Sequence, residues 1–180
     1  AIPHLAIVMS QRPVLSIIIV SFRTPDILRD CLRSLQAEVD LPCEVIVVDN
    51  ASGDDTVPMV RSEFPEVVLI ESATNLGFSP ANNLALERAT GEYLLLLNPD
   101  TVVRRGALAT WLQAHRSHGA GISGPRLLNT DGSLQVSAWK VPGLLASVLE
   151  LIYLHRWLGI GAYPRARFDT DLRPDFVSGA

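Results

Sequence analysis

The sequence predicts an α/β fold, in which helices flank a mostly parallel β-sheet. Three observations support this prediction: four short apolar runs of strand length, segments of helical apolar spacing between them, and little polar alternation within the runs. Strands that are apolar on both faces occur mainly in parallel sheets, because crossover helices cover the two sides. The expected strands are 15–20, 45–48, 67–70 and 93–97.

The helices between these strands carry start and stop signals. Thr24 is expected to cap a first helix whose opening turn holds Pro25-Asp26. A short second helix is expected at 56–64, and a third would begin at Ser79-Pro80 and end before Gly91. In the first helix, the apolar residues that repeat along one face are Ile27, Leu28, Cys31, Leu32 and Leu35.

The pattern changes after the fourth strand. A helix at about 105–117 and a strand near 121–124 are expected to complete the α/β region. Segment 126–136 predicts a hairpin that turns at 129–132, because Asn-Thr-Asp-Gly is a turn sequence. Beyond it we expect an apolar helical segment from 141 and the beginning of a strand at 175–180.

Composition argues against several classes of protein. The chain has 180 residues, of which 48% are apolar, and its formal net charge of −4 disfavours sequence-independent nucleic-acid binding. Cys31 and Cys43 match no metal-ligand spacing and no disulfide framework, so a reducing compartment is expected. We expect no signal peptide in 1–12 and no membrane-spanning helix at 141–154, which is short and contains Glu150.

Polar residues follow the ends of the predicted strands. Parallel strands bring these ends to one edge of the sheet, where open α/β proteins bind ligands. Ordinary turns are the alternative, in which Asp49 caps the next helix and Asp100 caps the turn before Arg105. The strand-end segments are Ser21-Phe22-Arg23, Asp49-Asn50-Ala51-Ser52, Asn75 to Ser79, and Asn98-Pro99-Asp100.

A phosphate site of the glycine-rich kind is not predicted. The sequence has no Gly-x-Gly-x-x-Gly after the first strand and no Gly-x-x-x-x-Gly-Lys motif. A bound phosphate would need another source of positive charge. Asp100, at the tip of a leucine-rich strand, could hold Mg²⁺ or Mn²⁺, which share carboxylate and phosphate oxygens.

Four motifs occur in register along the chain. They are LSIIIVSF at 15–22, VVDNASGDDT at 47–56, NLGFS at 75–79 with Asn82-Asn83, and LLNPDT at 96–101. Together they resemble the family-2 glycosyltransferases of GT-A (Rossmann-like) fold, and most closely the rhamnosyltransferase-like bacterial branch. The resemblance covers roughly 14–180. It implies a leader at 1–13, a nucleotide-sugar-binding half at 14–125, and the beginning of an acceptor half at 126–180, in a single domain whose acceptor half is missing from the chain.

The resemblance implies transfer of a sugar, rhamnose being one candidate, from a nucleotide diphosphate donor, with inversion at the anomeric carbon. Ser21, Phe22 and Ser52 would belong to the nucleoside pocket, and Asp49 would accept a hydrogen bond from the pyrimidine ring N–H. The acceptor would be a cell-envelope polysaccharide or a lipid-linked saccharide.

The same resemblance assigns the remaining donor residues and the metal. Gly77 and Asn82-Asn83 would shape the wall beside the ribose and diphosphate. Asn98-Pro99-Asp100 takes the place of the family's Asp-x-Asp motif, with Asp100 as the ligand of Mg²⁺ or Mn²⁺. The neutral Asn98 departs from that motif, which implies a weaker metal site.

Inversion requires a carboxylate that removes the proton of the acceptor hydroxyl, and the resemblance places this base beyond Ala180. A nucleotide-binding or interaction module without catalytic activity is therefore an alternative. A nucleotidyltransferase is a third hypothesis, but it would require a glycine-rich, basic loop after the first strand, which Ser21-Phe-Arg-Thr-Pro does not provide.

Segment 141–163 leaves two interpretations open. Its apolar stripe predicts a helix packed against the rest of the protein, or an interfacial helix that brings the enzyme to a lipid-linked acceptor. The expected location is cytoplasmic, with peripheral contact at the inner face of the membrane under the second interpretation.

Overall fold

The computed structural model describes residues 13–139 and 172–177. The chain divides into two compact units, 1–114 and 115–180, which are described separately. Residues 1–12 of the predicted leader, the predicted helical segment at 141–163 and the end of the predicted strand at 175–180 lie outside the described residues. Within the described part, no helix is long and apolar enough to cross a membrane.

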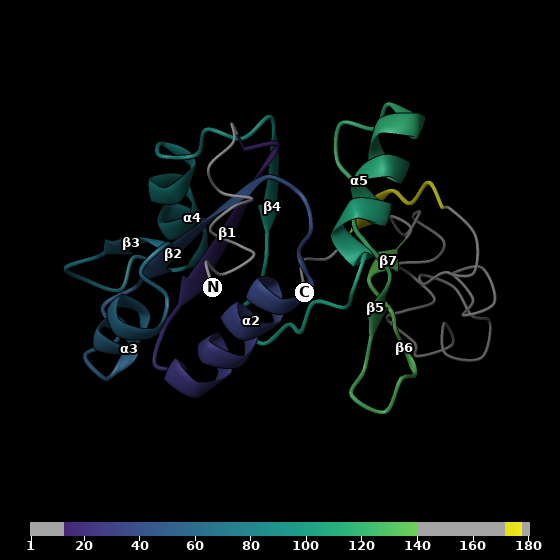
Figure 1. Cartoon of the computed structure of the whole chain (residues 1–180). Helices are drawn as coiled ribbons and strands as arrows, with labels where there is room; N and C mark the ends of the chain where they lie inside the picture. Colours follow the sequence, from purple (N-terminus) through teal and green to yellow (C-terminus); the bar gives the residue numbers. More distant parts are fainter. Residues whose placement is uncertain (1–12, 140–171, 178–180) are drawn as a thin grey trace, which may run out of the picture. The chain divides into compact units, whose positions relative to one another are not determined.

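The first unit is built on a parallel sheet of four strands in the order β3-β2-β1-β4 (Figure 1). This confirms the predicted α/β class. The central pair, β1 and β2, is aligned over seven residues from Leu15 opposite Cys43 to Ser21 opposite Asp49. The strands are β1 (Leu15–Ser21), β2 (Cys43–Asp49), β3 (Val68–Glu71) and β4 (Tyr93–Leu96).

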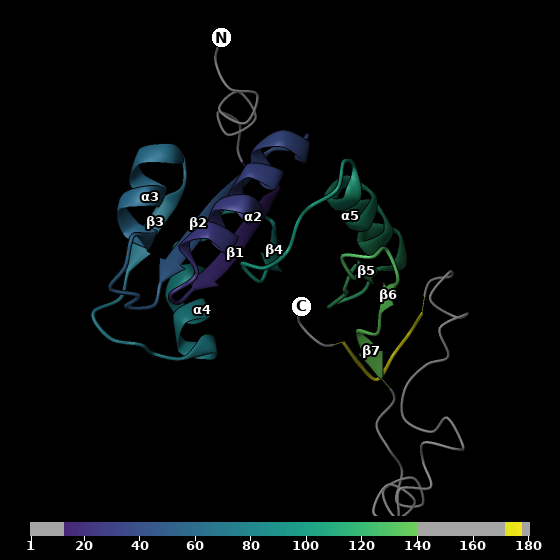
Figure 2. The same cartoon turned by 90° about the horizontal axis from the view of Figure 1, so that it is seen from below.

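Helices cover both faces of the central strands, and Figure 2 shows α2 and α3 on one face and α4 on the other. Alternate residues of β1, such as Ile17 and Ile18, point to opposite faces and are fully buried. The helices are α2 (Pro25–Glu38), α3 (Thr56–Glu63), α4 (Phe78–Leu86) and α5 (Ala107–His118).

The expectation that every strand is covered on both faces is wrong for the strands at the two sides of the sheet. In β4, Leu95 is buried in the core beneath α2, whereas Leu94 and Leu96 are each 49% exposed. Helix α4 packs over β1 and β2 and its buried residues do not reach these leucines. An unbroken leucine run therefore marked a strand but not its position in the sheet.

Two helix ends also differ from the prediction. Thr24 is the N-cap residue of α2, but its hydroxyl makes no capping bond and lies 3.1 Å from the Ser21 hydroxyl. Helix α4 ends at Leu86, before the predicted stop at Gly91. After Leu86 the chain turns and passes close to Ser16 at Gly91 before it enters β4.

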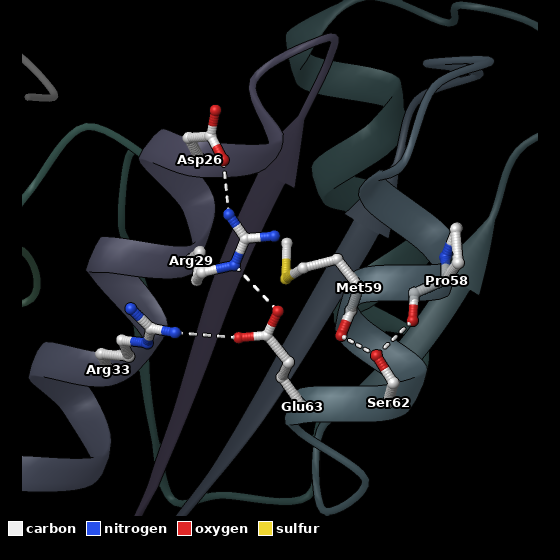
Figure 3. A network of polar contacts seen from close by, with 7 residues as sticks. All are labelled: Asp26, Arg29, Arg33, Pro58, Met59, Ser62 and Glu63. Atoms are coloured by element: carbon white, nitrogen blue, oxygen red, sulfur yellow. Dashed lines mark hydrogen bonds and ion pairs between the residues drawn. The ribbon is translucent and has the colours of Figure 1, made fainter.

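Helices α2 and α3 are joined by a network of ion pairs on their exposed sides (Figure 3). Glu63 of α3 accepts hydrogen bonds from Arg29 at 2.9 Å and Arg33 at 3.1 Å, and Arg29 also pairs with Asp26. Exposed pairs of this kind contribute about 0.2–1 kcal/mol each. The network aligns the two helices, while the apolar core beneath them supplies most of the stability.

Glu44 ties three segments together at the amino-terminal edge of the sheet. Its Oε1 accepts hydrogen bonds from the Ser16 hydroxyl at 2.6 Å, from the amide and hydroxyl of Thr90, and from the Gly91 amide. Gly91 is required there, because a Cβ would lie 2.6 Å from the Ser16 amide nitrogen. Although burial acts to raise the pKa of Glu44, these hydrogen bonds outweigh it and lower that pKa.

The second unit contains two small antiparallel pairs. Strands β5 (Leu127–Leu128) and β6 (Leu134–Gln135) form the predicted hairpin, with Gly132 in the left-handed region at φ 80°. Strand β7 (Ala138–Trp139) pairs with β8 (Phe176–Val177).

The strand predicted near 121–124 does not form. Gly121 and Gly124 favour turn conformations over a ladder, and Pro125 lacks an amide hydrogen. At Gly124 an added Cβ would lie 2.6 Å from the Val177 side chain, so the glycine allows β8 to approach the chain.

Replacement of Glu44 with Gln should lower stability in a pH-dependent manner. Because its folded pKa is lowered, the carboxylate stabilises the fold above its ordinary pKa of 4.5, and this contribution is lost as pH falls through the folded value. A loss of about 1 kcal/mol at pH 7 would lower Tm by about 2–4 °C. Thermal unfolding of E44Q and wild type, measured from pH 7 to pH 3, should show the Tm difference shrinking below pH 4.5.

The matched control is E87Q, which changes an exposed carboxylate beside the end of α4. Its Tm should equal that of wild type throughout. An E44Q protein that unfolds like E87Q at pH 7 would contradict the role given to Glu44.

Candidate functional site

The strands that lead to the predicted site residues are parallel, so their carboxyl ends lie at one edge of the sheet. Ser21 and Asp49 are the last paired residues of β1 and β2, and both side chains are buried. The backbone pairing continues past them, since the Asn50 amide donates to the Ser21 carbonyl at 2.9 Å. The first two strand tips are therefore fixed against each other by main-chain bonds.

Asp49 carries a carboxylate oxygen without a protein partner. Its Oδ2 accepts a bond from the Ser52 amide at 3.3 Å, whereas its Oδ1 is buried and accepts none. A buried polar atom left unsatisfied costs about 1–3 kcal/mol. A ligand that presents an N–H or O–H group to Oδ1 would remove that cost.

The first residue of the next helix, α3, is bonded by another acid, Asp54, which precedes the N-cap residue Asp55. Asp54 Oδ1 accepts hydrogen bonds from the Thr56 hydroxyl at 2.6 Å and the Thr56 amide at 2.9 Å. The Thr56 hydroxyl is the main cause of the lowered pKa of Asp54. Asp49 therefore does not cap this helix, although its Oδ2 makes a turn bond to the Ser52 amide, and its Oδ1 remains available to the site.

Arg23 belongs to a predicted strand-end segment but was given no role in the site, and in the structure it joins the two strand tips. Its amide donates to the Ser52 hydroxyl at 3.0 Å, and its Nε donates to the Ser52 carbonyl at 3.4 Å. Its guanidinium carbon lies 5.0 Å from the centre of the Phe22 ring, and Phe22 is 39% exposed. Ser52, a predicted donor residue, thus uses its hydroxyl and carbonyl to orient Arg23.

The backbone at these tips is strained. Arg23 and Ala51 have φ values of 58° and 64°, the left-handed region that residues with a Cβ seldom adopt. Such residues cost of order 1 kcal/mol or more each and tend to occur at functional sites. The sequence Ser-Phe-Arg-Thr contains no glycine or asparagine that would predict this conformation, so the role of Arg23 was not predicted.

The third strand leads into the loop that holds Gly77. Gly77 has φ 79° and ψ −179°, a conformation suited to glycine alone, and it precedes α4. In α4, Asn82 is buried and its Nδ2 donates to the Phe78 carbonyl at 2.8 Å, whereas Asn83 is exposed. The Asn82 amide group therefore fixes the first turn of the helix, and Asn83 faces solvent.

Asp100 lies at the same edge of the sheet, beyond β4. The strand pairing extends one step, with the Leu97 amide donating to the Ile18 carbonyl at 2.9 Å. A turn follows in which the amide and hydroxyl of Thr101 both bond the Asn98 carbonyl. The Asp100 side chain is exposed.

Asp100 does not belong to a cluster of three or more metal-ligand side chains among the described residues. Within 13–139 and 172–177, no three His, Cys, Asp or Glu side chains lie close enough to hold a metal ion. A single exposed carboxylate fits Mg²⁺ or Mn²⁺ only if phosphate oxygens and water complete the coordination. The geometry thus fits a cation that arrives with a diphosphate.

The family comparison agrees with this geometry. The model of the family described as Glycosyl transferase family 2 matches residues 16–156. A Mycobacterium tuberculosis protein, N-acetylglucosaminyl-diphospho-decaprenol L-rhamnosyltransferase, is 27% identical over 93% of this chain and 60% of its own length. A Campylobacter jejuni protein, GalNAc(5)-diNAcBac-PP-undecaprenol beta-1,3-glucosyltransferase, is 29% identical over 68% of this chain and 41% of its own length.

The solved structures support the same fold. Mannosyltransferase PcManGT from Pyrobaculum calidifontis, in complex with GDP-Man and Mn²⁺, matches at a TM-score of 0.53 and 27% identity, over 78% of this chain and 39% of that one. S. aureus TarS matches at a TM-score of 0.53 and 22% identity, over 68% of this chain and 24% of TarS. This chain therefore spans only part of each relative. It belongs to glycosyl transferase family 2 and has the GT-A fold.

Proposed function

We propose that the protein is the donor-binding part of an inverting glycosyltransferase that uses a nucleotide diphosphate sugar. The observation that carries the proposal is the buried, unpartnered Oδ1 of Asp49 at the edge where Ser21 and the Asp100 loop also lie. The family match favours this transferase over an interaction module and over a nucleotidyltransferase.

Recognition of the base is assigned to the tips of β1 and β2. Oδ1 of Asp49 would accept the ring N–H of a pyrimidine, which satisfies the atom that the protein leaves unpaired. Phe22, which is 39% exposed, lies at the adjacent tip. Gly77 and Asn83, both exposed, would form the opposite wall, and the buried Asn82 would hold the helix behind it.

The diphosphate is assigned to Asp100 together with Mg²⁺ or Mn²⁺. When bound, the cation would supply the charge that stabilises the departing nucleoside diphosphate. The Mn²⁺ complex of the Pyrobaculum mannosyltransferase supports this assignment. The position of Asp100 depends on the residues that bond to its loop.

Helix α2 makes hydrogen bonds to both ends of that loop, at Asn98 and Val103. The Ser34 hydroxyl accepts the Val103 amide at 3.0 Å and donates to the Cys31 carbonyl at 2.7 Å. The Cys31 thiol lies 3.9 Å from the Asn98 carbonyl, and burial raises the pKa of this thiol to about 11. The thiol therefore stays neutral and available as a donor, and both ends of the segment carrying Asp100 are fixed to one helix.

The acceptor is proposed from the relatives. Two of them are named for polyprenyl-diphosphate-linked substrates, and one of these transfers L-rhamnose. A lipid-linked saccharide as acceptor, rhamnose as one candidate sugar, and a cytoplasmic location at the inner membrane face are accordingly proposed for this protein. The general base, placed beyond Ala180 by the resemblance, remains a prediction.

Calorimetric titration with UDP and GDP, with and without Mn²⁺, tests the donor site in the full-length protein. Wild type should bind one nucleotide more tightly with Mn²⁺, and D100A should lose that increase. D49N should weaken binding by about tenfold, because an amide nitrogen would face the ring N–H where the carboxylate oxygen now lies. Its Tm should not fall, since the replaced atom has no partner.

The control for both variants is D30A, which removes an exposed carboxylate from α2. It should bind like wild type. If wild type binds neither nucleotide, or if D100A retains the full effect of Mn²⁺, the donor-site assignment fails.

Substitution of Ser34 tests how the Asp100 loop is mounted. S34A leaves the Val103 amide without its acceptor, so the effect of Mn²⁺ on nucleotide affinity should fall about threefold to tenfold while metal-free affinity is retained. S62A is the matched control, because the Ser62 hydroxyl donates to the Pro58 and Met59 carbonyls of its own helix (Figure 3). Equal metal responses in S34A and S62A would refute the role of Ser34.

A further inference from the structure

The loop between β3 and α4 is held by hydrogen bonds rather than by packing. Every residue from Ala73 to Pro80 is exposed, and a Cβ added to Gly77 would meet no atom within 4 Å. No apolar side chain of 73–77 is buried to anchor it. Its conformation therefore depends on the polar groups that it contacts.

One buried side chain supplies most of those contacts. Asn50, at 3% exposure, follows the last residue of β2. Its Oδ1 accepts the Leu76 amide at 2.9 Å, and its Nδ2 donates to Asn75 Oδ1 at 2.9 Å and to the Gly77 carbonyl at 3.3 Å. Asn75 Oδ1 also accepts the Gly77 amide at 2.9 Å, which closes the ring of bonds.

This ring requires an amide side chain at position 50. The Asn50 carboxamide uses its oxygen as an acceptor and its nitrogen as a double donor. An aspartate of the same shape could accept from Leu76 but could donate nothing, and its charge would face the Asn75 and Gly77 oxygens. The bonds also keep Gly77 at its positive φ, from which α4 begins.

Asn50 follows Asp49 in the sequence. The tip of β2 therefore carries both the Asp49 carboxylate and the side chain that holds loop 75–77. The Asn50 amide nitrogen donates to the Ser21 carbonyl, and the Ser72 amide donates to the Asp49 carbonyl, both at 2.9 Å. The main chain at 49–50 is thus fixed on both sides. The loop residues that Asn50 bonds, 75–77, are therefore positioned relative to the Asp49 carboxylate.

We infer that Asn50 is a positioning residue of the donor site, which sets loop 75–77, and with it Gly77, against Asp49 without touching the donor. The inference rests on the proposed function, in which Gly77 forms part of the wall of the donor site. Loss of the Asn50 side-chain bonds should leave the sheet folded, because Asn50 bonds to β1 through its main-chain amide, which a side-chain substitution retains. The loop should then sample other conformations and bind nucleotide less tightly.

Three variants of the full-length protein test this inference. N50D removes the two donations while it keeps the shape of the side chain. N75A removes the shared acceptor from an exposed position, so its fold should not be at risk. N129D is the matched control, because Asn129 makes a similar turn bond from its Nδ2 to the Ser133 hydroxyl, at 2.8 Å, in the β5–β6 hairpin.

Two measurements are made on each protein, amide hydrogen exchange of Leu76 and Gly77, and UDP or GDP affinity by calorimetry. In N50D and N75A both amides should exchange faster, and nucleotide affinity should fall about tenfold, the effect expected from one buried hydrogen-bond network. N129D should match wild type in both measurements.

The outcomes separate this inference from the proposed function. If wild type binds neither nucleotide, the proposed function fails. If wild type binds and N50D and N75A bind equally well, the function stands and the inference is overturned. Faster exchange without loss of affinity likewise overturns it, because Asn50 would then hold only a surface turn.

Discussion

The register between β1 and β2 is the constraint on which the site depends. Seven consecutive residues pair in parallel, and the pairing ends with Ser21 opposite Asp49. Side chains alternate between faces, so a slip of one residue would turn Asp49 from the α2 and α3 side to the α4 side. Such a slip would exchange the side chains packed against α2 and α3 for those packed against α4, which a close-packed core tolerates poorly, and the core thereby fixes the position of a carboxylate at its edge.

The opposite edge of the sheet sets the position of Asp100. Glu44 in β2, Ser16 in β1 and Gly91 before β4 are hydrogen-bonded together where these strands begin. This fixes where β4 enters the sheet, and its parallel pairing with β1 then carries the chain to Asn98 and Asp100. The length of a strand is set by its number of residues. Hydrogen bonds that fix the start of β4 therefore also fix where Asn98 and Asp100 lie at the opposite edge.

The sequence predicted the parts of the fold that depend on burial and periodicity. The four strands and the first two helices appear close to their expected bounds, because an apolar run must be covered and a helical stripe must face a core. Features that depend on position in the sheet were not predictable, since Leu94 and Leu96 are identical in sequence character to the buried Leu95. The strand expected near 121–124 failed because glycine outweighed a weak apolar signal.

The candidate site was predictable only in part, for a related reason. Strand ends and turn residues predicted that Ser21, Asp49 and Asp100 would lie at one edge, because parallel strands share their polarity. The residues that organise them, Arg23 and Asn50, lie in the same strand-end segments, but their roles could not be predicted from the sequence. Their roles arise from a left-handed backbone and from contacts with chain 25–29 positions away, neither of which has a local sequence signal.

The distribution of unfavourable features identifies the functional edge without reference to any family. Within the described residues, both non-glycine residues in the left-handed region, Arg23 and Ala51, lie at the carboxyl edge, beside the unsatisfied oxygen of Asp49. At the amino edge, the Glu44 oxygen is fully engaged by protein donors. Selection for stability alone gives no reason to keep strain and an unpaired acceptor together. A ligand that bonds to Asp49 provides one, because it would satisfy Oδ1 and offset the cost of burying that atom without a partner.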